Sequence, residues 1–438
     1  MFLNYFMAKK ENGLLRIFPA LGVRNYQYYF TGQLISQVGT WLQIVSEGWL
    51  VLQLTNSAFL IGVVAACATL PSLLFSLFGG VIVDRFDRKK LIIVTQFLSM
   101  IFALALAGLT YTHLITVWQI ALFAFLLGVV NSVDMPARQA FVHEMVGKDK
   151  MSSAIALNAG IFNSARVIGP SVAGILIAIV GPAGAYLING LSYIAAIIVQ
   201  VLIVPIKHPR PKDHAHPIQA IKEGVSYTVK HPVIRSFIIL TAIVSIFGWS
   251  YTTIMPFIAK NIFHQDAAGL GYLYAATGVG ALLATFTVSA WGNKVSPYIF
   301  VLGGNIIFAL SMIGFSFIHH IIPAYIFLCI GGFGLLSAFA VINSEIQHLV
   351  EEQFRGRVLS LYLLMFVGLF PLGNFQVGFI SEHLGPQFAI RLGAFIVLIA
   401  AIGGFFVRGK VIKAHEEYLS KNEIGEGTRE VLADSIRH

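Results

Sequence analysis

Apolar residues in this chain come in long runs separated by short polar segments, without the period of two that marks a strand. The twelve longest runs lie at about 26–52, 58–83, 90–110, 115–135, 154–180, 184–206, 234–258, 268–290, 297–318, 322–349, 358–382 and 385–408. A helix needs roughly 20 apolar residues to cross a hydrocarbon core of about 30 Å. We therefore expect an all-α integral membrane protein with twelve transmembrane helices.

Composition supports this expectation. Apolar residues make up 57% of the chain and charged residues 11%, and the mean hydropathy is +0.79. Soluble proteins carry about 25% charged residues. Nothing before Tyr26 resembles a cleavable signal peptide. The two cysteines, Cys67 and Cys329, fall inside apolar runs, which favours packing over a disulfide.

Basic residues predict the orientation. If both termini are cytoplasmic, 26 of the 29 Lys and Arg residues, Arg138 among them, fall in cytoplasmic segments. Lys260 falls in an outer loop, and Arg166 and Arg391 fall within spans. The positive-inside rule therefore favours a multi-pass protein with both ends inside. The same asymmetry explains the net charge of +9, so nucleic acid is not needed as a partner.

One long polar stretch divides the runs six and six. The predicted segments are an N-terminal segment (1–25), a first half (26–206), a central loop (207–233), a second half (234–408) and a cytoplasmic tail (409–438). The loop should contain an amphipathic helix from Pro217 to Lys230. Its histidines are better explained as a solvated linker than as a metal site, and we expect no metal or cofactor. A shift of 204 residues places Gly169 on Gly373 and Gly174 on Gly378, as in transporters built from repeated halves.

The first run carries a polar stripe. At 100° per residue, six polar side chains share an arc of about 120°: Gln33, Ser36, Gln37, Thr40, Gln43 and Glu47. The opposite face carries Leu34, Ile35, Val38 and Leu42. A polar stripe in a membrane helix faces protein or water rather than lipid. Glu47 is either a wetted, inert residue near the outer surface or a functional carboxylate, and the unbroken stripe favours function.

Two further segments carry a family resemblance. GGVIVDRFDRKK (79–90) resembles the loop signature of the major facilitator superfamily, with matches at Gly80, Asp84, Arg85, Arg88 and Lys89, although Asp87 stands where the signature has glycine. The fifth run resembles the superfamily's antiporter signature at Gly169, Pro170 and Gly174, with Ala173 in place of a glycine. Together with DMPARQAF and RGRVLSLY, these segments resemble the branch that contains the enterobactin exporter and macrolide-efflux proteins.

The resemblance implies a fold and several roles. The fold would be the major facilitator fold, with twelve transmembrane helices in two pseudo-symmetric six-helix halves. Asp84 would lock the cytoplasmic side against the helix that begins near Arg355 and Arg357. Asp134 is either an interfacial cap or a partner of Arg88. The first, fourth, seventh and tenth helices would line the cavity, which adds Asn131, Trp249, Tyr251, Asn343 and Glu345 to the stripe as candidate residues.

These observations lead to a functional hypothesis. We expect a secondary active exporter of a small amphipathic molecule, a siderophore or drug, in a bacterial inner membrane. Proton antiport is the expected energy source, since no Walker A sequence is present. The candidate coupling residues are Glu47, Arg166, Asp134 and Glu345. An uncoupled facilitator or an importer of the same fold is the alternative. An enzyme or a non-transporting receptor is less favoured, because no catalytic motif appears. We expect a monomer in the lipid bilayer; the sequence does not identify the substrate.

Overall fold

The computed structural model describes residues 16, 18–147, 149–204, 217–292 and 294–421. Most of the predicted N-terminal segment, the first ten residues of the central loop with three of its histidines, and the end of the tail lie outside these ranges. Helices make up the regular structure of the described residues, as expected. The chain divides into two compact units: unit 1 comprises residues 1–47 and 74–212, and unit 2 comprises residues 48–73 and 213–438.

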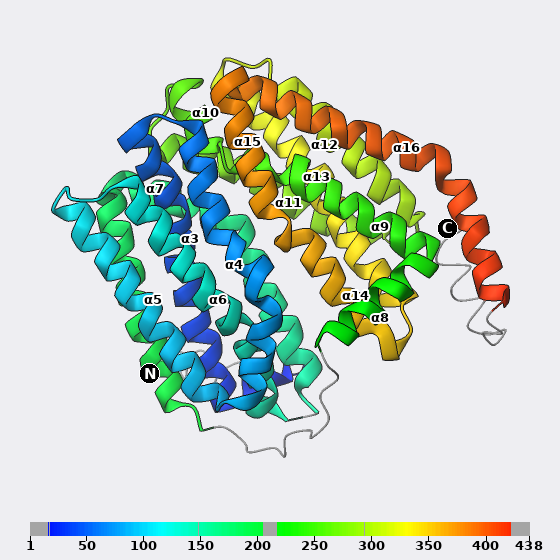
Figure 1. Ribbon diagram of the computed structural model, residues 1–438, viewed down its shortest axis with the longest axis horizontal. Coiled ribbons are helices and arrows are strands. Elements are labelled where there is room, and N and C mark those ends of the chain that lie inside the picture. The colour runs from blue at the N-terminus through cyan, green and yellow to red at the C-terminus, as the bar shows by residue number, and fades with distance from the viewer. Residues whose placement is uncertain (1–15, 17, 148, 205–216, 293, 422–438) are drawn as a thin grey trace. The chain divides into compact units, whose positions relative to one another are not determined.

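Unit 1 is a bundle of long helices (Figure 1). It contains η1 (Pro19–Gly22), α3 (Arg24–Thr55) as far as Glu47, α4 (Ala58–Arg85) from Leu74 onward, α5 (Arg88–Tyr111), α6 (Val117–Val146) and α7 (Met151–Leu202). α7 is two helices joined at Gly181, whose φ of 70° suits a residue without a side chain. Pro182 then begins the second helix. The sequence predicted a boundary between runs at this position.

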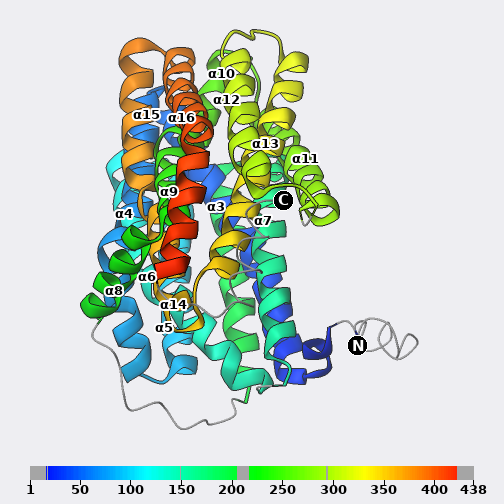
Figure 2. The ribbon, with the colours of Figure 1, turned by 90° about the vertical axis from the view of Figure 1, so that its right-hand side faces the viewer.

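Unit 2 contains more interrupted helices (Figure 2). Its elements after the central loop are α8 (Pro217–Lys230), α9 (Pro232–Ile243), η2 (Val244–Gly248), η3 (Trp249–Thr252), α10 (Met255–Asn261), α11 (Ala267–Trp291), η4 (Ile299–Gly303), α12 (Gly304–Phe315), α13 (Ile321–Leu349), α14 (Glu352–Leu363), η5 (Leu364–Gly368), α15 (Phe370–Leu384) and α16 (Pro386–Lys421). Three of them, η2, η4 and η5, are π-helical. Such segments widen a helix by one residue and often occur at functional sites.

The hairpin formed by the end of α3 and the start of α4 belongs to unit 2. α4 crosses α15 closely, because a Cβ on Gly62 would lie 2.9 Å from the Cα of Gly378. At the tip, Ser57 and the backbone of Phe59 both donate hydrogen bonds to Glu382, at 3.0 and 3.1 Å. Small residues allow the approach, and hydrogen bonds hold the tip. Residues of the first sequence half therefore pack against helices of the second.

Each predicted apolar run coincides with a helical segment. Within the described ranges, nine helices are long and apolar enough on their own to cross a membrane. α3 is not among the nine, and we attribute this to its polar stripe. The predicted fourth run was too short, since it ended at residue 135 and α6 continues to Val146.

This extension of α6 includes Arg138. The residue was counted among the basic residues of a cytoplasmic segment, and it lies on α6 beyond the predicted run, with 8% of its surface exposed. Its partner Asp134 is four residues earlier, so the two side chains meet on one face of the helix. Each charge offsets part of the desolvation cost of the other, so the pair can be buried although either charge alone would stay exposed.

Candidate transport site

The polar stripe of α3 is largely buried within unit 1. Gln33, Ser36, Gln43 and Glu47 are buried, and Gln37 and Thr40 are half-buried. Leu34, Ile35 and Val38 on the opposite face are exposed, although Leu42, which was expected on that face, is fully buried. The stripe thus faces neighbouring helices over much of its length, and two of its glutamines belong to separate hydrogen-bond networks.

The first network centres on the ion pair of α6. Nε of Arg138 lies 2.6 Å from the Asp134 carboxylate, and another guanidinium nitrogen donates to the side-chain oxygen of Gln33 at 2.6 Å. From α5, Thr95 and Gln96 donate to the same Asp134 oxygen at 2.5 and 3.2 Å. The network joins α3, α5 and α6 and compensates both charges. Arg138 was not identified as a site residue, although the i,i+4 spacing in DMPAR signals the pair.

The second network ends at Glu47. Asn189 on α7 is fully buried and donates to the Gln43 side-chain oxygen at 2.5 Å. The Gln43 amide in turn donates to Oε1 of Glu47 at 2.9 Å. A Cβ on Gly39 would collide with the Asn189 and Ser192 side chains, so the glycine allows α3 and α7 to approach. The Glu47 carboxyl group, 8% exposed, therefore ends a row of oriented amides.

The predicted lock loop lies between α4 and α5. Arg88 lies 2.9 Å from the Glu144 carboxylate on α6 and 4.0 Å from that of Asp84. Asp134 therefore pairs with Arg138 rather than with Arg88. Lys89 donates to the backbone carbonyls of Val201 and Ile203, at 2.8 and 2.7 Å. A Cβ on Gly80 would meet no other atom within 4 Å, and Arg85 is exposed.

Asp87 replaces the glycine of the family signature and has a structural role of its own. It is the N-cap of α5, and its carboxylate accepts a hydrogen bond from the backbone N–H of Lys90 at 2.9 Å. An aspartate at this position satisfies an otherwise unpaired helix donor and favours the start of the helix. Asp87 therefore stabilises the start of α5 in place of the glycine of the signature.

The predicted antiporter signature lies on the first part of α7. The indole ring of Trp41 on α3 lies where a Cβ on Gly169 would be, so only glycine allows this contact. Pro170 and Gly174 are buried in the same helix. Arg166, one turn before Gly169, is half-buried. A cation in a membrane span needs a partner, and the pairing of Arg166 with Glu47 or with helix carbonyls stays a prediction.

In unit 2 the cavity candidate Trp249 belongs to an aromatic cluster, which it forms with Phe339, Phe366 and Phe370. The Trp249 ring meets the edges of Phe339 and Phe366, with ring centroids 5.8 and 5.9 Å apart, and stacks on Phe370 at 6.3 Å. Trp249 begins η3 and Phe366 lies within the π segment η5, so irregular helices position both rings. Aromatic rings of this kind can pack against planar, amphipathic molecules.

The other unit 2 candidates have different environments. Tyr251 is 3% exposed and packs near Phe308, with ring centroids 6.0 Å apart. Asn343 and, in unit 1, Asn131 are exposed, whereas Glu345 is 9% exposed on α13. Exposed amides can contact a substrate, while a buried carboxyl can only exchange protons or bind after a rearrangement.

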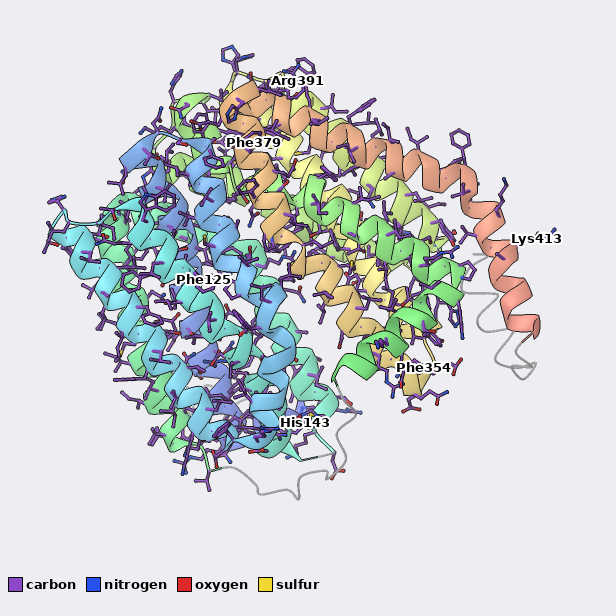
Figure 3. The ribbon with its side chains drawn as sticks, in the orientation of Figure 1. Phe125, His143, Phe354, Phe379, Arg391 and Lys413 are labelled. Carbon is purple, nitrogen blue, oxygen red and sulfur yellow. The ribbon has the colours of Figure 1, made fainter. Side chains whose placement is uncertain are left out.

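The helix α14 supplies the predicted partner segment of the lock. Arg355 is exposed, and Arg357 forms an ion pair with Glu223 of α8. Next to this pair, Tyr227 of α8 stacks on Phe354 of α14 with ring centroids 4.6 Å apart; Figure 3 labels Phe354 beside α8. The predicted amphipathic helix thus exists and packs on α14. Glu223 had not been identified as the partner of Arg357.

In the described part of the chain no three histidine, cysteine, aspartate or glutamate residues come together as a metal site. The arrangement instead offers buried carboxyl groups, amide networks and an aromatic cluster within a bundle of membrane-length helices. These features suit the passage of a small molecule through a membrane and are typical of a membrane transporter.

Comparison with known proteins gives the family. A profile of the transmembrane secretion effector family matches residues 18–433, so the chain belongs to that family of major facilitator transporters, a class without enzymatic activity. The chain is 27% identical to a staphyloferrin A transporter of Staphylococcus aureus over 89% of this chain and 98% of that protein. It is 24% identical to an enterobactin exporter of Escherichia coli, over 89% and 92% of the two chains. The predicted resemblance is confirmed.

Solved structures show the same fold. A bacterial homologue of the human lysosomal transporter Spinster, in an inward-facing and unoccupied conformation, aligns with a TM-score of 0.69 at 12% identity, over 92% of this chain and 99% of that chain. A D-xylose–proton symporter aligns with a TM-score of 0.66 at 13% identity, over 86% and 95% of the two chains. The chain therefore has the all-α major facilitator fold.

Proposed function

We propose that this protein exports a siderophore-type molecule by alternating access and that inward proton movement drives the export. The names of two relatives, a staphyloferrin A transporter and an enterobactin exporter, support the substrate class. The aromatic cluster around Trp249 supports a substrate with planar or amphipathic parts.

The observation that carries the proton coupling is the position of Glu47. It is a buried carboxyl group in a membrane helix, and the Gln43 amide holds it at the end of the second network. An ionised carboxylate in this environment is costly, so the group must be protonated, paired or hydrated. A conformational change that alters its hydration alters its proton affinity, which is what coupling requires.

Other residues take supporting roles in this proposal. Arg166 approaches Glu47 in one of the transport states and displaces its proton. Asp134 and Glu345 are the next candidates for coupling. The Asp84–Arg88–Glu144 group, with Arg355 and Arg357, closes the cytoplasmic side when the cavity faces outward. The contact of Gly62 with Gly378 separates in that state, because it holds the α3–α4 hairpin on α15.

The proposed setting follows from the basic residues. The chain is a multi-pass protein of the bacterial inner membrane with both termini in the cytoplasm, and it works as a monomer. No cofactor is required, since the ion gradient supplies the free energy.

Everted membrane vesicles test the proposal directly. Staphyloferrin A and enterobactin are added outside, and uptake is measured with and without an imposed pH gradient. We expect uphill uptake of at least one compound with the gradient, and loss of uphill uptake in Glu47→Gln, while downhill exchange remains. Glu352→Gln, which removes an exposed carboxylate outside the candidate site, is the control for the loss of a charge.

The outcomes separate the alternatives. Uptake without any effect of the gradient identifies an uncoupled facilitator, and movement only in the opposite sense identifies an importer. If Glu47→Gln still concentrates substrate with normal pH dependence, Glu47 is not the coupling residue.

A further inference from the structure

A cavity lies in unit 2, and none of the candidate transport residues discussed above lines it. Its volume is about 240 Å³, and it lies between α9, η4 with the preceding Tyr298, and α16. α16 contributes Ala400, Gly404, Val407, Arg408 and Val411, which share one face of the helix, and α9 contributes residues that include Ser236 and Ile239. Figures 1 and 2 both show α9 beside α16.

The cavity is lined mainly by apolar side chains, and some of these are exposed on the outer surface of the unit. Ile239 and Val407, which line it, are 53% and 46% exposed, and their neighbour Phe406 is 79% exposed. Gly404 has no side chain to fill the space, and a Cβ there would lie 2.9 Å from Leu302. An engineered apolar cavity of about 150 Å³ already takes up benzene, so this one is large enough for part of an alkyl chain. Left empty, it would forfeit dispersion contacts.

Positive charge marks one end of the cavity. The Arg408 guanidinium lines it and stacks on the Phe405 ring, 4.1 Å from the centroid. Arg235 is exposed on α9, one turn before Ile239 and on the same helix face. Residues 386–414 of α16 and the whole of α9 contain no Asp or Glu. Figure 3 labels Arg391 and Lys413 near opposite ends of α16, and Arg408 lies in the part nearer Lys413 in sequence.

We infer that this cavity binds one anionic phospholipid. An acyl chain occupies the apolar space, and the phosphate lies at Arg408 and Arg235. Tyr298 also lines the cavity but neighbours the buried Glu345, which disfavours an anion at that end. The basic residues predict that the Arg408 end is cytoplasmic, and basic pockets between helices on that side recognise anionic headgroups. The inference does not depend on the transported substrate.

Native mass spectrometry of the purified full-length chain tests this site. The probes are phosphatidylglycerol and phosphatidylcholine with identical acyl chains, added in equal amounts. We expect one retained lipid, with phosphatidylglycerol preferred. A cation near the surface changes the binding of an anion by about fivefold, so Arg408→Gln should lower the preference by about that factor. Ala400→Phe should fill the cavity and remove both lipids.

Matched controls lie on the same helix. Lys413→Gln removes an exposed charge that does not line the cavity, and Ile399→Phe adds a ring at the adjacent, exposed position. Both should bind lipid like the wild type. Equal retention of the two lipids by the wild type, or an unchanged preference in Arg408→Gln, overturns the proposal. If Ala400→Phe does not yield folded protein, Arg408→Gln still decides it, because its side chain is exposed.

Discussion

The two units differ in what occupies their interiors. Unit 1 buries charges and amides: Arg138 with Asp134 and Gln33, and Glu47 with Gln43 and Asn189. Unit 2 instead holds a cluster of aromatic rings, with Trp249 among Phe339, Phe366 and Phe370. In the described ranges, the π-helical segments all belong to unit 2. In the proposed function, unit 1 therefore carries the proton movement, and unit 2, which also buries Glu345, supplies aromatic contacts with the bound molecule.

The ion pairs show the same difference. The Arg138–Asp134 side chains of unit 1 are each 10% exposed, whereas Arg357 and Glu223 of unit 2 are 32% and 34% exposed. Removing one member of a buried pair leaves an uncompensated charge, while an exposed pair is screened by water. Burial, rather than the presence of a pair, should therefore decide the effect of a substitution.

The largest expected effect is on the stability of unit 1. Arg138→Met leaves the Asp134 carboxylate buried with only Thr95 and Gln96 as donors, which should cost about 3–5 kcal/mol. We expect a clear drop in the thermal unfolding temperature of the purified protein. The double change Asp134→Leu with Arg138→Met should recover most of the loss, because no lone charge remains. Lys90→Met, at an exposed position, is the control. If Arg138→Met unfolds at the wild-type temperature, the pair is hydrated rather than buried.

A smaller effect is expected on substrate binding by unit 2. Trp249→Leu removes three ring contacts, and an aromatic pair contributes about 0.5–1.5 kcal/mol. Siderophore affinity should fall by roughly tenfold, measured by equilibrium binding to purified protein, because the substrate loses one aromatic contact of this size. The unfolding temperature should also fall, but by less than in Arg138→Met. Trp291→Leu is the matched control, since Trp291 is 53% exposed in the same unit. Equal losses in the two variants would show that the aromatic cluster does not contact the substrate.

The sequence predicted the helices well, because each apolar run of membrane length has one stable conformation in lipid. It also located the polar face of α3, which follows from helical geometry alone. It missed Asn189 as a partner of that face and Glu144 as the partner of Arg88, since pairing across helices depends on packing that no local pattern encodes. It did not reveal that Arg138 is buried, because charge was used as a marker of the surface, and that rule fails for a compensated pair.

The smallest effect is expected at the ion pair between α8 and α14. An exposed pair contributes about 0.2–1 kcal/mol, so Glu223→Arg and Arg357→Glu should each speed amide hydrogen exchange in α8 by at most about fivefold. The charge-swapped double variant should return to the wild-type rate, because it restores the attraction with reversed signs. Lys222→Glu, at the exposed neighbouring position, is the control for net charge. If the single variants exchange at the wild-type rate, the stack of Tyr227 on Phe354 holds α8 on α14 without the ion pair. Aromatic contact would then dominate at this surface of unit 2 as it does in the aromatic cluster, and the difference between the two units would be sharper.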